Sequence, residues 1–133
     1  MNLFVDTIVW SLAWRRDDVP STPEISALRQ ALDSGDAIYS TGLVLQELLQ
    51  GFSRPKAHGL IIEHFRSLPL LVPDRRDHIE AADLRTACRR AGVQVGTIDA
   101  LLAQLCIRHE LTMLSSDHDF QRIATVVPLS NWR

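Results

Sequence analysis

Hydrophobic residues along this chain fall into short continuous runs, separated by longer segments in which they recur every three or four residues. A short run rich in β-branched and aromatic residues is typical of a strand buried on both faces, and the longer spacing is typical of an amphipathic helix. The runs predict strands at residues 3–5, 37–39, 70–72, 112–114 and 126–127. The spaced segments predict helices at about residues 8–14, 23–34, 43–50, 54–67, 76–91 and 98–109, and a short helix that ends at 124.

Strands that alternate with helices predict an α/β fold, in which a mostly parallel sheet is covered by helices on both faces. The chain of 133 residues fits one domain, 1–133, and its 46% of hydrophobic residues suffices for a core. Residues 15–18 are all charged and Pro20 follows, so we expect an exposed loop at residues 15–20.

Composition and charge narrow the functional classes. The net charge of −2 gives no overall basic surface, so a nucleic-acid partner would have to be held by local arginines or through a metal. Cys88 and Cys106 fall in predicted helices without metal-ligand spacing, which indicates buried thiols in a reducing compartment. Asp6 interrupts the first apolar run, and no run approaches the ~20 residues that span a membrane. We therefore expect a cytoplasmic protein with no membrane association.

Two acids follow predicted strands: Asp6 comes after the first strand and Asp117 after the fourth. The carboxyl ends of parallel strands share one edge of the sheet, where ligands bind. Aspartate is also a favoured helix N-cap, so each residue could simply cap the next helix. Taken singly, both interpretations stay open.

Two further acids stand in apolar surroundings. Glu47 lies in a helix that is otherwise nearly all apolar, where a carboxylate is costly without a partner. Gln46 and Gln50 leave a solvated helix face as the alternative. Asp99 stands in the first turn of an apolar helix, which also suits the helix dipole. If all four acids converge, their mutual repulsion raises their pKa values unless a cation neutralises it.

A hard divalent cation is the natural partner of such a cluster. Mg²⁺, or Mn²⁺, prefers oxygen ligands and can activate a water for the hydrolysis of a phosphodiester. No Ser/His/Asp or Cys/His arrangement stands out as a competing catalytic machinery. His118 lies between Asp117 and Asp119, and we interpret it as an exposed turn residue.

Four segments, taken in their order and spacing, resemble the PIN-domain ribonucleases, and most closely the VapC-type toxins of bacterial toxin–antitoxin pairs. The segments are Phe4-Val5-Asp6-Thr7, Glu47-Leu48-Leu49-Gln50-Gly51, Thr97-Ile98-Asp99-Ala100-Leu101-Leu102-Ala103 and Leu114-Ser115-Ser116-Asp117-His118-Asp119-Phe120. The resemblance implies a three-layer PIN-like fold of about five parallel strands in the order 3-2-1-4-5. It also implies a Mg²⁺-dependent endoribonuclease, a homodimer, and a cognate antitoxin, a small DNA-binding protein with an inhibitory C-terminal segment.

The same resemblance assigns roles by position. The family's catalytic and metal-binding acids are matched by Asp6, Glu47, Asp99 and Asp117. Asp119 matches a second acid and is expected to be an outer or occasional ligand. Hydroxyls that orient ligands or waters in the family are matched by Thr7, Thr41, Thr97 and Ser116. Plain helix capping explains these hydroxyls equally well.

Other functional classes fit less well. A receiver-like signalling module would need paired acids after the first strand and a late lysine, but Asp6 has no acidic neighbour and the only lysine is Lys56. A haloacid-dehalogenase-type phosphatase would need a second aspartate where Ile8 stands. A PIN-fold scaffold would keep repelling carboxylates without use. A PIN-fold nuclease of housekeeping RNA processing stays open.

The residues that contact RNA and the antitoxin are less clear from the sequence. Arginines come in pairs, at 15–16, 75–76 and 89–90, and some would hold backbone phosphates, although the sequence does not say which. Trp10 and Trp14 share one helix face, which is explained by core packing or by an aromatic stripe that receives an antitoxin helix. A further hypothesis is that the antitoxin's C-terminal segment places a basic side chain among the acids.

Overall fold

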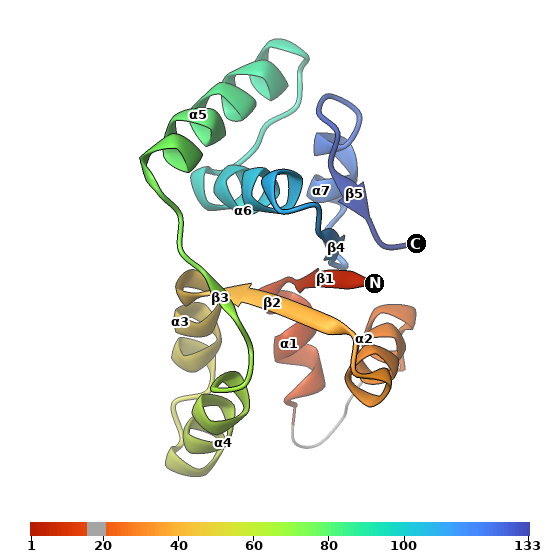
Figure 1. Ribbon diagram of the computed structural model, residues 1–133, viewed down its shortest axis with the longest axis vertical. Helices are drawn as coiled ribbons and strands as arrows, with labels where there is room; N and C mark the ends of the chain where they lie inside the picture. The colour runs from red at the N-terminus through yellow and green to blue at the C-terminus, as the bar shows by residue number, and fades with distance from the viewer. Residues whose placement is uncertain (16–20) are drawn as a thin grey trace.

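The computed structural model describes residues 1–15 and 21–133 of the chain (Figure 1). The strands are β1 (Asn2–Val5), β2 (Ala37–Thr41), β3 (Leu70–Leu71), β4 (Thr112–Leu114) and β5 (Ser130–Asn131). The helices are α1 (Thr7–Ala13), α2 (Pro23–Ser34), α3 (Gly42–Gly51), α4 (Pro55–Phe65), α5 (Arg75–Arg90), α6 (Thr97–Arg108) and α7 (His118–Ile123). Beyond Arg15, the loop predicted at residues 15–20 lies outside the described part of the chain.

The strands form one parallel sheet in the order β3-β2-β1-β4-β5, which confirms the predicted fold class and strand order. β1 is central: Phe4 pairs with Tyr39 of β2 on one side and with Met113 of β4 on the other. Figure 1 shows α1 to α4 on one side of the sheet and α5 to α7 on the other. Because β1 is covered on both faces, Leu3, Phe4 and Val5 are all buried, which explains why the sequence there does not alternate.

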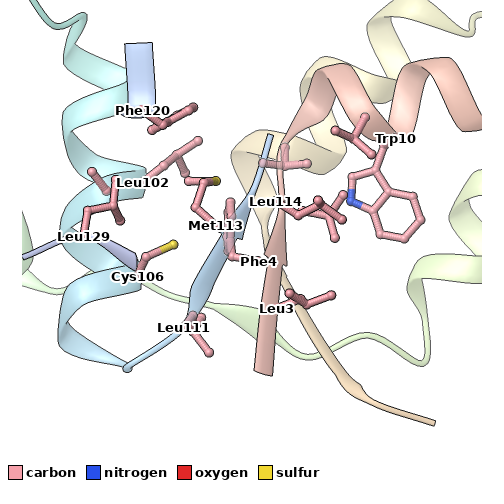
Figure 2. Packing of buried hydrophobic residues seen from close by; sticks show 14 of the residues in the cluster. Leu3, Phe4, Trp10, Leu102, Cys106, Leu111, Met113, Leu114, Phe120 and Leu129 are labelled. Carbon is pink, nitrogen blue, oxygen red and sulfur yellow. The ribbon is translucent and has the colours of Figure 1, made fainter. Parts of the chain in front are cut away.

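The core lies on both faces of the central strands. Figure 2 shows Leu102 and Cys106 of α6 packed toward Met113 on one face, and Trp10 of α1 on the other. Full burial of each large apolar side chain contributes about 1.5–3 kcal/mol. Cys88 and Cys106 are buried and unbridged, as predicted. The core therefore fixes the positions of the carboxyl ends of β1 and β4, and Asp6 and Asp117 follow these ends in the sequence.

One predicted strand is wrong. Val126 and Val127 form turns, because their N–H groups donate to the carbonyl oxygen of Ile123 at 3.0 and 3.1 Å and so continue the end of α7. Pro128 follows and has no N–H to offer a neighbouring strand. β5 pairs with β4 instead. The other predicted elements agree with the structure to within a few residues.

Helices α5 and α6 are held together by an ionic contact that the sequence analysis did not anticipate. Asp77 is fully buried, shares a capping box with Asp74, and pairs with the guanidinium of Arg108 on α6. The side-chain amide of Gln104 on α6 donates to Glu80 of α5 at 2.6 Å. These contacts fix α5 relative to α6, which carries Asp99.

Within the described residues, no helix combines the length and the apolar character that crossing a bilayer requires.

Candidate metal centre at the carboxyl edge of the sheet

Asp6 is the acid placed most firmly by the fold. It follows β1 and is only 7% exposed. One carboxylate oxygen accepts the N–H of Thr7 at 2.7 Å, and the other accepts the hydroxyl of Ser115 at 2.8 Å. Burial raises the pKa of Asp6 above its usual value, hydrogen bonds from Ser115 and Thr7 oppose that rise, and the charges of Asp117 and Glu47 add to it. Asp6 therefore caps α1 and also carries a charge that its surroundings disfavour.

Ser115 is a site residue that the sequence analysis missed in favour of its neighbour. Its hydroxyl donates to Asp6 and accepts the N–H of Asp117 at 2.9 Å, so it ties the end of β1 to the start of α7. Ser116, which was expected to orient ligands, is exposed. Register could have identified Ser115: Val5 pairs with Leu114, so the next residue after each strand, Asp6 and Ser115, must lie side by side.

Three carboxylates converge beside this pair. Asp99, Asp117 and Asp119 each place one oxygen within 4.8 Å of the others, and all three side chains are half-buried. Asp117 also caps α7, because its side chain accepts the N–H of Asp119 at 2.9 Å. Asp119, predicted as an outer ligand, is thus one of the three carboxylates that come closest together, whereas Asp6 and Glu47 lie outside that tight group.

The acids nevertheless share one electrostatic field. Burial, followed by the charges of Asp6, Asp117, Asp119 and Glu47, raises the pKa of Asp99 from 3.8 to about 6. A carboxyl with such a pKa is only about half ionised at pH 6 unless positive charge is supplied. Three close carboxylates offer the hard oxygen donors that Mg²⁺ and Mn²⁺ prefer, so the residues present fit a divalent cation.

Glu47 reaches the site from an exposed position. Its oxygen accepts the hydroxyl of Thr7 at 3.1 Å, which links α3 to the first turn of α1. Of the two interpretations left open for Glu47, the solvated helix face is correct, because only Val44 and Leu48 of α3 are fully buried and the face with Glu47 is exposed. A helix with half-buried faces can carry as many leucines as a fully buried helix, so the leucine content alone does not distinguish the two.

The other predicted hydroxyls differ in their environment. Thr41 is buried and its hydroxyl accepts the N–H of Val44 at 3.1 Å, so it caps α3. Thr97 begins α6 and is exposed. His118 is exposed at the start of α7, as predicted, with its ring 3.3 Å from Gln121.

Trp10 of α1 belongs to the core, and Trp14, which follows the helix directly, lies at the edge of the core. Trp10 is 1% exposed, with ring centroids 5.5 Å from His64 and 5.0 Å from Phe65. Trp14 is half-buried and lies 5.8 Å from the same histidine. For Trp10, core packing is the correct one of the two interpretations.

Comparison with known proteins agrees with the fold and with the predicted family. The PIN domain model matches residues 3–126. Ribonuclease VapC11 of Mycobacterium tuberculosis is 30% identical over 129 residues, which cover 96% of this chain and 95% of the relative. The chain belongs to the PIN-domain family, among its VapC-type ribonucleases.

Two solved structures share the fold at lower identity. FitAcB from Neisseria gonorrhoeae superposes with a TM-score of 0.74 at 17% identity, covering 98% of this chain and 96% of its own. VapBC2 from Rickettsia felis, bound to a DNA fragment from its promoter, gives 0.74 at 22% identity and covers 100% of both chains. Membership of the PIN family sets aside the receiver-like and phosphatase alternatives.

Proposed function

We propose that this protein is a Mg²⁺- or Mn²⁺-dependent endoribonuclease that acts as the toxin of a toxin–antitoxin pair. One observation carries the proposal: Asp99, Asp117 and Asp119 bring carboxylate oxygens within 4.8 Å of one another beside buried Asp6, in a chain of the VapC ribonuclease type. An acidic pocket repels a phosphodiester, so cleavage of RNA there requires positive charge from a cation.

In this proposal Asp99, Asp117 and Asp119 hold the cation, and Asp6 and Glu47 add negative charge or complete the ligand set. When bound, Mg²⁺ or Mn²⁺ would neutralise charge on the phosphate and lower the pKa of a water near it, which is the chemistry of metal-dependent nucleases.

The chain's own residues prepare the site for this task. Ser115 fixes the orientation of the Asp6 carboxylate, and Thr7 holds Glu47 toward the same edge. Arg122 pairs with Asp119 and places a cationic group beside the ligands. Preorganised groups of this kind need little rearrangement when the phosphate arrives.

The partners follow from the same proposal. A cognate antitoxin, a small DNA-binding protein, inhibits the nuclease with its C-terminal segment, which places a basic side chain among the acids. A cavity of about 590 Å³, lined by Trp14, Phe52 and Leu60 together with the cationic Arg54 and Lys56, is the seat we propose for an amphipathic part of the antitoxin. Full inhibition by an antitoxin that lacks its C-terminal segment would refute this mechanism of inhibition.

We also propose that the protein is a homodimer that works in the cytoplasm.

The test of the activity uses purified protein without its antitoxin. Structured RNAs are incubated with wild type, Asp6→Asn and Asp99→Asn in Mg²⁺, in Mn²⁺ and in EDTA. Asp33→Asn is the matched control, because Asp33 is exposed on α2, away from the acids. We expect cleavage by wild type and the control with metal, and at least a hundredfold loss in both site variants. Equal cleavage by the site variants, or undiminished cleavage in EDTA, would refute the proposal.

A further inference from the structure

A groove on the surface meets the acidic cluster at one end. It has a volume of about 770 Å³ and is lined by Arg85 and Arg89 of α5, by Asp119 and Arg122 of α7, and by the segment 92–96 that joins α5 to α6. We call it the arginine groove. Its volume lies in the range of ligand sites, and its three guanidinium groups are exposed.

The charge of the groove is opposite to that of the chain. Three arginines and one carboxylate line it, whereas the whole protein has a net charge of −2. Arg85 and Arg89 stand one helical turn apart, about 6 Å along α5. The Nε of Arg85 donates to the carbonyl oxygen of Val95 at 2.7 Å, which holds this guanidinium at the groove wall. Within the described residues, the side chain of Arg89 makes no hydrogen bond or ion pair, and it is exposed and available to a ligand.

The groove is continuous with the candidate metal centre. Asp119 belongs to both, and its partner Arg122 stands at the junction. Gly96 lines the groove and is the N-cap of α6, but it supplies no side-chain cap for the helix. The first N–H groups of α6 therefore add uncapped donors and the positive end of a helix dipole near the groove.

We propose that the arginine groove binds the phosphates that neighbour the scissile phosphate on the same RNA strand. The inference rests on the proposed nuclease function and names the residues that hold the substrate. Guanidinium groups suit phosphates, since they donate two parallel hydrogen bonds and remain charged. RNA is favoured over an acidic peptide because a strand cut at the acids must pass Asp119, where the groove begins.

The test measures binding and cleavage separately. Binding of a labelled single-stranded RNA is followed by fluorescence anisotropy in Mg²⁺, on an Asp99→Asn background that prevents cleavage. Arg89→Gln is expected to weaken binding about tenfold at ~0.1 M salt and to lower the slope of log affinity against log salt by about 0.7. In the otherwise wild-type enzyme, the same change is expected to raise KM more than it lowers kcat.

The matched control is Arg29→Gln, which removes the same charge from α2 on the opposite side of the sheet and should leave affinity and slope unchanged. Thermal melts confirm that each variant is folded. If wild type cleaves RNA and Arg89→Gln binds like the control, the groove assignment is wrong and the nuclease stands. If wild type cleaves no RNA, both proposals fall. If Arg89→Gln loses affinity for an oligo-glutamate peptide but keeps it for RNA, the groove serves an acidic protein and our inference is wrong.

Discussion

Repulsion among the acids at the carboxyl edge should destabilise the metal-free protein, so Asp99→Asn should be more stable than wild type at pH 7. A carboxyl whose pKa rises from 3.8 to about 6 on folding destabilises the folded state by about 3 kcal/mol once it is ionised. Asp99 is only half-buried, so solvent screening reduces this and we expect a gain of about 1–2 kcal/mol from the amide at pH 7. For a chain of this size, the gain corresponds to a rise in Tm of roughly 4–10 °C.

The pH dependence gives the sign independently. The unfolded chain releases the Asp99 proton near pH 3.9, but the folded chain keeps it to about pH 6. Stability therefore falls as pH rises from about 4 to 6 and is level above that range. Asp99→Asn should show a smaller fall, because it lacks the contribution of Asp99 and keeps only that of Asp6, whose pKa is also raised.

The assay is urea unfolding in EDTA from pH 4 to 8, followed by circular dichroism. Asp33→Asn, an exposed acid on α2, is the control and should stay within about 0.5 kcal/mol of wild type at every pH. A variant that is less stable than wild type at pH 7, or that keeps the same fall between pH 4 and 6, would show that the acids do not share a common field.

Two further predictions concern the groups that support the site. Ser115→Ala should lower Mn²⁺ affinity about 10–100-fold, because Asp6 then loses its hydroxyl donor and the N–H of Asp117 loses its acceptor. Ser116→Ala is the control and should bind Mn²⁺ as wild type does. Equal affinities in a fluorescence titration would contradict the role of Ser115. Arg108→Met should cost about 2–3 kcal/mol in urea unfolding, because it leaves the buried carboxylate of Asp77 without its counter-ion. Burial raises the pKa of Asp77, but hydrogen bonds from Asp74 and Arg108 outweigh burial, so the pKa is lowered overall. The wild type should therefore lose stability as pH falls below about 4, and the Arg108→Met variant should lose less. An unchanged acid limb in the variant would refute the ion pair's contribution.

The sequence predicts the central part of the sheet well because burial on both faces leaves a local pattern. Leu3, Phe4 and Val5 form a continuous apolar run for that reason, and Asp6 then marks the edge. β5 is two residues long, a serine and an asparagine, and its pairing is set by β4 rather than by its own side chains. The valines before it have the composition of a strand, but their N–H groups are taken by α7. Strands this short follow from tertiary contacts that a local pattern does not contain.

The same limit applies to the site. Motif order identifies Asp6, Asp99 and Asp117, but it does not measure distance, so the first turn of α7 brings Asp119 closer to Asp99 than the sequence indicated. The arginine groove combines Arg89 with Arg122, which are far apart in the chain. The packing of α5 on α6, with its ionic contact, and the loop at 92–96 bring them to one surface.

The central claim is that carboxylates from separate parts of the chain share one divalent cation. Calorimetric titration of the antitoxin-free protein with Mn²⁺ tests it most directly, with Asp99→Asn, Asp117→Asn and Asp33→Asn measured alongside. We predict saturable binding by wild type and Asp33→Asn, and affinity at least tenfold weaker in each of the other two variants. Two results would contradict the account: a Mn²⁺ affinity in both Asp99→Asn and Asp117→Asn equal to that of wild type, or no Mn²⁺ binding by a protein that still cleaves RNA.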